Sequence, residues 1–317
     1  MSKLQTSIAA IIALASLSAC GTTQAVQPSQ LFEAGWNSGQ NASEPAFQAQ
    51  YIDADTVVIR QSIRTTFEAP FLYLLFGEDK VLLIDTGVEG ADLRSEVDAH
   101  IAKWLDANGK TDIQLVIMHT HGHGDHIGGD SSFSDRPDTI TVGHTAKDVA
   151  NYFGIENWPI GTGSINLGDR TLEVLPTPGH HDSHVMVFDP KTHILFSGDT
   201  IYPGRLYFQC GKASLFQSSI ERAATFAASR DVRWVLGAHI EMTTKQGKAF
   251  QGQNNVRKGE HVLELPVSII GDIQSALNDQ NGQFRVTNFD DFVLFPHPAD
   301  PTGMSPPDWC LSDASTY

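Results

Sequence analysis

The stretch HTHGHGDHIGG, residues 119–129, holds four of the 13 histidines of this 317-residue chain within eight positions. Neutral imidazole is the commonest protein ligand of transition metals. In an extended loop alternate side chains point the same way, so His121 and His123 can bind one ion together. Asp125 and His126 then turn toward a second ion as the chain enters a helix at the glycines that follow. The stretch therefore predicts a metal site, and its residues are best interpreted as ligands of two ions.

Three later segments carry the same residue types where apolar strands end. They are PTPGHHDSH with His180, LFSGDT with Asp199 and VLGAH with His239. Strand ends are where sites tend to be built. Two cations about 3.5–4 Å apart can share a water, lower its pKa toward neutrality and polarise the carbonyl that the resulting hydroxide attacks. This chemistry needs no serine or cysteine nucleophile, and Ser183, which lacks the context of a nucleophile elbow, is expected to be structural.

The elements that must position these side chains are short β-rich runs separated by turn residues, from about residue 51 onward. Residues 91–110 carry apolar side chains at four-residue spacing and stop at Gly109, which predicts an amphipathic helix. Residues 218–229 begin with Ser218 and Glu221 in the register of a capping box and predict a second helix. Residues 184–199 predict a hairpin across the turn DPKT.

The order of the motifs resembles that of the metallo-β-lactamase superfamily. That family shows an aspartate in DTG after a strand, the HxHxDH loop, a histidine in PGH, an aspartate in GD and a late histidine in GH or AH. All five occur here in that order, over roughly residues 51–250. The resemblance implies an α+β fold, an αββα sandwich that carries its metals at one edge.

The resemblance also implies a ligand set for two zinc ions per chain. Manganese or iron are alternatives, because ligand sets of nitrogen and oxygen accept several metals. One ion would be bound by three histidines: His121, His123 and His180. The other would be bound by Asp125, His126 and His239, and Asp199 would bridge the two. Asp85 of IDTG would orient the loop without binding metal.

Other polar side chains are candidates for contact with a substrate. Tyr202 lies three residues after Asp199, where lactonases of this superfamily place a tyrosine that hydrogen-bonds the substrate carbonyl. Asp125 and Tyr202 are therefore the expected catalytic residues, with packing as the alternative for Tyr202, and Arg205 is expected to line the pocket. The remaining nearby histidines are expected to be structural, with supporting or substrate contacts as the alternative for the last three: His119, His144, His181 and His184.

The function expected first is a hydrolase that uses a metal-bridging hydroxide on a carboxylic ester, lactone or thioester. A bridging aspartate at Asp199 suits such enzymes, whereas zinc β-lactamases that resemble this chain usually have cysteine or serine there. The formal net charge of −16 opposes nucleic-acid partners and polyanionic substrates, which leaves a small molecule as the expected substrate. Flavodiiron proteins have glutamate in place of the second histidine of the loop, so His123 disfavours that class. Glutathione thioesters are mostly cytosolic, which disfavours them as substrates of a chain with the export signal described below.

Three alternatives stay open. The first is a β-lactam hydrolase, because the periplasm is where those drugs are met. The second is a mononuclear iron enzyme that resembles the persulfide dioxygenases, which would leave the second site empty and would not require His239. The third is a non-catalytic, lipid-anchored binding protein, which the loss of a ligand would indicate.

The first 20 residues differ from the rest of the chain. Lys3 is followed by an apolar run over residues 8–17 and by LSAC, which ends at Cys20. This pattern is typical of a secretory signal, and the run is short for a membrane span. LSAC resembles the lipobox of bacterial lipoproteins, which implies lipidation of Cys20 and an anchor in the cell envelope facing the periplasm. An ordinary cleaved signal is the alternative, and the lipid would be the protein's only contact with a membrane.

The expected domains follow from these boundaries. Residues 1–20 form the lipoprotein signal, residues 21–46 a flexible tether rich in Ser, Gln, Thr and Asn, and residues 47–250 the hydrolase domain. Residues 251–317, with their Pro-rich end, form a cap packed on that domain. Cys210 and Cys310 are expected to be a disulfide or two buried thiols, because an exported protein meets an oxidising compartment.

Overall fold

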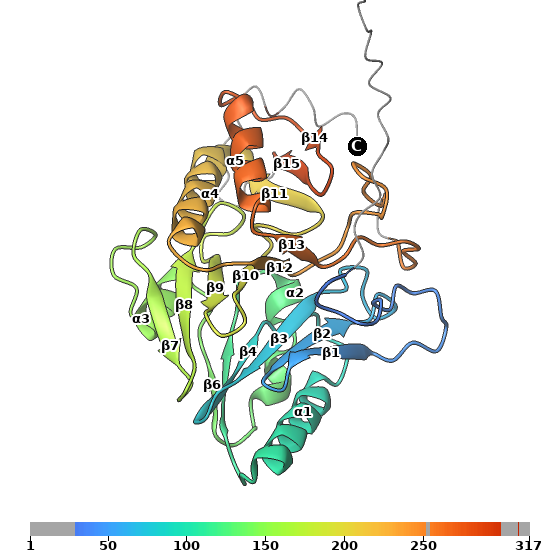
Figure 1. Ribbon diagram of the computed structural model, residues 1–317, viewed down its shortest axis with the longest axis vertical. Helices are drawn as coiled ribbons and strands as arrows, with labels where there is room; N and C mark the ends of the chain where they lie inside the picture. The colour runs from blue at the N-terminus through green and yellow to red at the C-terminus, as the bar shows by residue number, and fades with distance from the viewer. Residues whose placement is uncertain (1–28, 252–253, 299–309, 311–317) are drawn as a thin grey trace, which may run out of the picture.

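The computed structural model describes residues 29–251, 254–298 and 310, and within them two six-stranded sheets stack face to face with helices on both outer faces (Figure 1). The signal segment with Cys20, residues 21–28 and most of the chain after residue 298 lie outside the described residues. None of the helices in the described part is both long enough and apolar enough to cross a bilayer.

The first sheet carries the loop rich in histidine. Its strands follow one another in chain order: β1 (Phe47–Asp53), β2 (Thr56–Gln61), β3 (Phe71–Phe76), β4 (Lys80–Ile84), β5 (Gln114–Met118) and β6 (Thr139–Thr141). The first four strands pair antiparallel, and β4, β5 and β6 pair in parallel. Ile84 lies opposite Met118. The segments that follow them, from Asp85 and from His119, therefore leave the sheet side by side.

The second sheet ends at the same edge of the sandwich. Its strands, in spatial order, are β13 (Glu264–Pro266), β12 (Trp234–Gly237), β10 (Ile194–Gly198), β9 (Val185–Asp189), β8 (Thr171–Pro176) and β7 (Gly163–Asn166). The hairpin predicted across DPKT is confirmed, since β9 and β10 are antiparallel. β10 and β12 are parallel with Gly198 opposite Gly237. The residues after them, Asp199 and the pair Ala238 and His239, are thereby brought together.

The central strands are buried on both faces, because alternate side chains pack against the other sheet and against the outer helix. One face of each sheet packs against the other sheet, and helix α1 (Leu93–Asn108) covers the outer face of the first sheet. The helix buries four side chains: Leu93, Val97, Ile101 and Trp104. It ends at Gly109 in the left-handed conformation, with φ of 63°, as the sequence predicts. The short helix α3 (Ala146–Phe153) follows β6 and contacts β7.

Helices α4 (Ala213–Ala228) and α5 (Ile269–Asp279) cover the outer face of the second sheet and contact each other (Figure 1). The predicted start of the first of these at Ser218 is wrong, since α4 begins five residues earlier without a side-chain cap. Phe216 explains the difference, because it is fully buried and stacks on Phe208 with ring centroids 4.6 Å apart. Tertiary packing extends the helix past the local capping signal.

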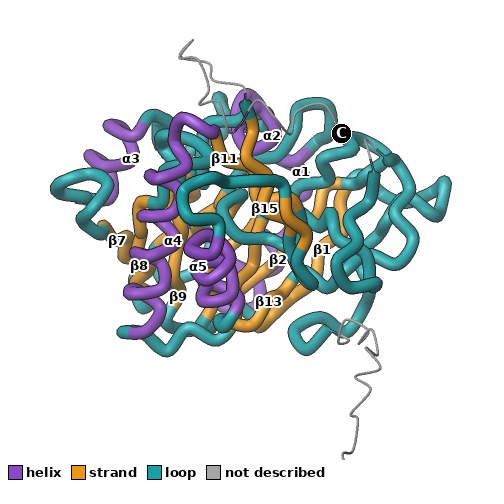
Figure 2. The backbone as a smooth tube through the Cα atoms, turned by 90° about the horizontal axis from the view of Figure 1, so that it is seen from above, coloured by secondary structure: helices purple, strands orange, loops and turns teal. Residues whose placement is uncertain are grey.

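A third sheet, of three strands, packs against helix α4 on the outer side of the second six-stranded sheet. β11 (Arg205–Gln209) pairs in parallel with β15 (Val293–His297), which pairs antiparallel with β14 (Thr287–Asn288), and Figure 2 shows β15 alongside β11. The C-terminal segment is thus more than an added cap, since it supplies β13, α5, β14 and β15 to these layers. Cys210, which follows β11, is bonded to Cys310, so the structure shows the disulfide.

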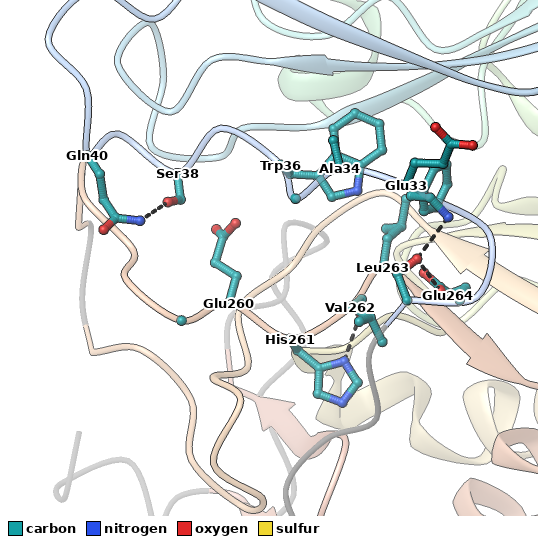
Figure 3. Close-up of a pocket in the computed structure, with 14 residues that line it drawn as sticks. Glu33, Ala34, Trp36, Ser38, Gln40, Glu260, His261, Val262, Leu263 and Glu264 are labelled. Carbon is teal, nitrogen blue, oxygen red and sulfur yellow. Dashed lines mark hydrogen bonds between the residues drawn. The ribbon is translucent and has the colours of Figure 1, made fainter.

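The segment expected to be a flexible tether packs on the domain from its first described residue. Phe32 is 7% exposed, and the ring of Trp36 contacts Phe71 edge-on at 4.9 Å. The expectation of a tether is therefore wrong for residues 29–46, because two aromatic side chains within a polar segment are enough to dock it. Figure 3 shows the cavity of about 380 Å³ that this segment encloses with residues 259–264.

Candidate metal centre

The seven side chains predicted as metal ligands meet where strands of both sheets end. Four come from the loop after β5 and from helix α2 (Gly124–Ile127), and the other three follow β8, β10 and β12. The structure brings them into two clusters, within each of which the candidate ligand atoms lie within 4.8 Å of one another. The histidine cluster consists of His121, His123 and His180. The carboxylate cluster consists of Asp125, His126, Asp199 and His239.

In the histidine cluster three imidazole nitrogens converge. Nε2 of His121 lies 2.8 Å from Nδ1 of His123, and Nε2 of His180 lies 3.1 Å from the same atom. Burial lowers the pKa of all three groups, that of His121 well below its ordinary value and that of His180 to about 4. The three rings are therefore neutral at pH 7, which is the form that binds a metal.

The carboxylate cluster has the spacing of ligands around one ion. Nε2 of His126 and Nε2 of His239 each lie 3.4 Å from the Asp125 carboxylate, and they lie 3.3 Å and 3.2 Å from Oδ1 of Asp199. Ligands about 2.0–2.2 Å from a tetrahedral ion stand about 3.3–3.6 Å apart. Among the described residues, His126 Nε2 and Asp199 Oδ1 are buried without a hydrogen-bond partner. A cation between these atoms would satisfy both, so the residues fit a metal.

Asp199 reaches both clusters. Its Oδ1 faces the carboxylate cluster, whereas its Oδ2 lies 3.5 Å from Nε2 of His180 and 4.0 Å from Nε2 of His121. The backbone N–H of Asp199 donates to Nε2 of His184 at 3.2 Å, which holds the aspartate in place from behind. One carboxylate oxygen is thus directed to each cluster.

The outer ring nitrogens of the histidines are held by the surrounding protein. Four outer nitrogens have an oxygen partner at 2.8–3.2 Å: His126 with Asp85, His180 with the Tyr207 carbonyl, His239 with the Glu68 carbonyl and His121 with the Thr120 hydroxyl. A hydrogen bond to the outer nitrogen fixes which nitrogen faces the metal and how the ring is oriented. These four contacts direct Nε2 into the clusters.

Asp85 lies behind the histidine-rich loop, as its expected role requires. The Thr120 backbone N–H and hydroxyl donate to its two carboxylate oxygens at 2.7 and 2.9 Å, and Nδ1 of His126 lies 2.8 Å from Oδ2. Asp85 itself has a φ of 66° and is fully buried. It therefore links the first residues of the loop to a histidine of the carboxylate cluster.

In the metal-free protein the carboxylate cluster is an ion-paired network. Burial alone would lower the pKa of His126 and His239, but the nearby carboxylates, Asp199 foremost, outweigh it and raise both pKa values well above the ordinary range. Burial alone would raise the pKa of Asp199, but the two imidazoles outweigh it and lower that pKa well below its ordinary value. This cluster therefore holds protons on the same nitrogens that would bind a metal.

The four other histidines that the sequence placed near the site are His119, His144, His181 and His184. His184 is fully buried between Asp199 and the hydroxyl of Thr177, which lies 2.8 Å from its Nδ1. Nε2 of His119 lies 2.8 Å from Asp130, and with His144 these residues form a third group of metal-ligand type. The ring of His181 lies 4.9 Å from that of His123.

The residues expected to contact a substrate differ in placement. The Tyr202 hydroxyl donates to the Arg205 carbonyl, and the Glu241 carboxylate lies 3.3 Å from it. This geometry favours packing, the alternative expected for Tyr202, because the donor already has a partner in the protein, and its contact with a substrate carbonyl stays a prediction. Arg205 does line a cavity, of about 860 Å³, together with Glu68 and Tyr207.

Glu68 and Tyr207 did not emerge from the sequence as functional residues. Their backbone carbonyls hold His239 and His180, a role that leaves no mark on residue type because every residue has a carbonyl. The one available signal was the alternation along residues 205–209, which places Arg205 and Tyr207 on the same face of a strand.

The part of the chain that carries the metal-ligand candidates is similar to known proteins. The family model described as "Metallo-beta-lactamase superfamily" matches residues 65–239, which include all five motifs from Asp85 to His239. This match confirms the resemblance and the α+β sandwich that it implied.

The curated relatives are named hydroxyacylglutathione hydrolase. The protein from Mesorhizobium japonicum is 32% identical over 117 residues, which are 36% of this chain and 45% of that protein. The one from Xylella fastidiosa strain 9a5c is 26% identical over 186 residues, 54% of this chain and 69% of that protein. The chain thus spans about half the length of the first relative. A metallo-beta-lactamase structure from Pontibacter korlensis has a TM-score of 0.49 and 18% identity over 74% of this chain and 100% of that one.

Proposed function

The chain belongs to the metallo-beta-lactamase superfamily, and from this premise we propose that it is a hydrolase with two zinc ions per chain that cleaves a carboxylic ester, lactone or thioester. One observation carries the proposal: Asp199 directs one carboxylate oxygen to each of two clusters whose atoms have the spacing and the unsatisfied polar groups of metal ligands. The name of the curated relatives supports including thioesters among the substrates.

We assign each residue of the centre a part in this reaction. When bound, two such cations supply a water of lowered pKa as nucleophile and polarise the carbonyl that it attacks. The histidine cluster offers neutral nitrogens, and Asp199 keeps the two sites at a fixed separation. The contacts of Asp85, Glu68 and Tyr207 hold the imidazole rings in place before substrate arrives, so that little reorganisation is needed during the reaction.

Asp125 has a second part in the proposal. Its side chain is 20% exposed, against 9% or less for the other side chains of the carboxylate cluster. It is therefore the ligand of that cluster that incoming water and substrate would meet. We assign it both metal binding and contact with the reacting water, which keeps it among the catalytic residues.

The experiment that tests the proposal is metal analysis combined with a substrate panel. Purified protein should contain close to two equivalents of metal and should hydrolyse at least one member of a set of chromogenic esters, lactones and thioesters. A one-to-one metal ratio that persists after zinc is added, with no hydrolysis, would favour the mononuclear iron alternative. A chromogenic cephalosporin is added to the panel, and its turnover faster than that of every ester, lactone and thioester would favour the β-lactam hydrolase.

We also propose, from the sequence alone, that the protein is exported and lipid-anchored at Cys20 in a bacterial cell envelope, facing the periplasm. The apolar run followed by LSAC supports this. Cys20→Ser should release the protein from membranes and block lipid labelling. Recovery of the unaltered protein in the soluble fraction, with a free amino terminus at another residue, would show that the anchor is wrong.

A further inference from the structure

A cavity of about 860 Å³ lies directly beside the metal centre. Its inner wall includes Glu68 and Tyr207, whose carbonyls hold His239 and His180. Glu68 therefore contacts a ligand of the carboxylate cluster, and Tyr207 contacts a ligand of the histidine cluster. Cavities of about 300–1,000 Å³ are typical of small-molecule sites. These two contacts make the cavity the candidate place for the part of a substrate that extends away from the clusters.

The third sheet lines the cavity with three largely apolar side chains, Tyr207, Val293 and Phe295, and with two polar ones, Arg205 and Asn288. Tyr207 of β11 and Phe295 of β15 are neighbours across the parallel pair, with ring centroids 4.7 Å apart. Val293 lines the cavity from the same strand as Phe295, and Val286 and Phe67 extend the apolar surface. The alternate residues of β11 are buried against α4, so the two faces of this sheet have different partners.

The guanidinium groups at this cavity already have partners within the protein. Arg205 lies 3.5 Å from the Glu241 carboxylate and donates to the Phe250 carbonyl. Arg257 donates to the carbonyls of Ile240 and Phe67 at 2.8 and 2.6 Å. These contacts occupy part of the donors of each guanidinium, and Nε of Arg257 is buried without a hydrogen-bond partner among the described residues. Lys248 also lines the cavity, and no carboxylate among the residues that the structure describes lies within ion-pair distance of it.

We propose that the third sheet is the specificity wall of the enzyme and that it binds an uncharged, apolar chain or ring of the substrate. The proposal rests on the proposed hydrolase function and narrows it to esters, lactones or thioesters with a medium-length aliphatic or an aromatic tail. Because burying each methylene group is favourable, four added methylenes should raise kcat/KM by on the order of 10- to 100-fold.

Two substrate series test this from both sides of the scissile bond. p-Nitrophenyl acetate, hexanoate and monoadipate vary the acyl side with a constant leaving group, and the adipate has a carboxylate in place of the terminal methyl of the hexanoate. γ-Butyrolactone and γ-octalactone vary the alcohol side. The expected order is hexanoate above both acetate and monoadipate, and octalactone above butyrolactone, in kcat/KM of the zinc-loaded enzyme.

Substitutions in the wall test whether the preference for hexanoate over acetate depends on this cavity. Phe295→Ala should reduce the ratio of hexanoate to acetate to near one, and Val286→Trp, which fills the cavity, should do the same by blocking the longer chain. Tyr152→Ala is the matched control, since Tyr152 is an exposed aromatic residue on α3, outside the cavity lining, and this variant should keep the ratio. If Phe295→Ala does not fold, Val286→Trp carries the test.

Binding of N-phenyl-1-naphthylamine, an apolar fluorescent probe, separates the two proposals because it needs no turnover. Its fluorescence should rise with the unaltered protein and with Tyr152→Ala, and should rise less with Val286→Trp. If the probe binds in this pattern but no ester or lactone is cleaved, the proposed function fails and the apolar wall stands. If esters are cleaved with equal kcat/KM for acetate and hexanoate, or with monoadipate preferred through Lys248, the wall proposal is overturned.

Discussion

The two clusters of the metal centre lie side by side but differ in charge. The histidine cluster contains three neutral imidazoles whose pKa values burial lowers, whereas the carboxylate cluster contains two carboxylates and two histidines whose pKa values those carboxylates raise. The first can accept a cation at pH 7 without releasing protons. The second must release them, and in return it offers a cation two negative charges. Similar burial thus produces two sites that respond differently to pH and to mutation.

The largest expected effect comes from removing the charge that the clusters share. Asp199→Asn should abolish the second equivalent of metal and lower kcat/KM by roughly 1,000-fold, about 4 kcal/mol in the activation barrier. Metal analysis and hydrolysis of the best substrate check this. Asp182→Asn is the control, since that carboxylate is exposed and pairs with Lys212. An Asp199→Asn enzyme with both metals and full activity would refute the bridging role.

A smaller effect is expected from the residue behind the loop. Asp85→Asn replaces an acceptor for Nδ1 of His126 and for Thr120, and it should weaken metal binding by about 10- to 100-fold. The loss of metal affinity should be larger at the carboxylate cluster, because His126 belongs to it. Competition with a chromogenic chelator measures both equivalents separately. Equal weakening of the two would mean that Asp85 supports the loop as a whole.

Acidification should empty one site before the other. The raised pKa values of His126 and His239 mean that a cation must displace protons there, so affinity falls as pH falls through neutrality. The lowered pKa values of the histidine cluster delay proton competition to more acidic conditions. Protein dialysed at about pH 8 should keep two equivalents and at about pH 6 close to one. His239→Ala should remove the equivalent that is sensitive to pH, and His123→Ala the other one.

The smallest effect is expected at Tyr202, which contacts the carboxylate cluster only through the edge of its ring, 5.6 Å from that of His239. Tyr202→Phe should keep both metals and a rate within about threefold of the unaltered enzyme, because its hydroxyl donates to the Arg205 carbonyl. The lost hydrogen bond should cost about 1 kcal/mol of stability, measurable by chemical denaturation. A fall of 100-fold or more in rate at full metal content would restore the catalytic role expected from the sequence.

The placement of the ligand candidates could be predicted because two simple patterns coincide in them. Each follows an apolar run of strand length, and strands that pair in parallel end at the same edge, as β4 with β5 and β10 with β12 show. The division into two clusters followed from the alternation of His121 and His123 and from the turn at Asp125. Residue type and spacing were sufficient for the histidine-rich loop, whereas the assignment of His180, Asp199 and His239 to the two clusters came from the resemblance to the superfamily.

Features that depend on tertiary contacts could not be predicted in the same way. The start of α4 depends on Phe216 meeting Phe208, and the docking of residues 29–46 depends on Trp36 meeting Phe71. The expected role of Tyr202 depended on where its hydroxyl points, which no spacing determines. The roles of Glu68 and Tyr207 use backbone atoms, so their side-chain chemistry gave no signal.

The parallel pairing of β11 with β15 has a consequence for the order in which the chain folds. Arg205 pairs with Val293, and Cys210 is bonded to Cys310, 100 residues later. Contacts between residues so distant in sequence form slowly, since a long loop must close first. All seven ligand candidates precede residue 240. The metal centre can therefore assemble before β15 pairs with β11, and the later docking of residues 286–297 would complete the proposed wall.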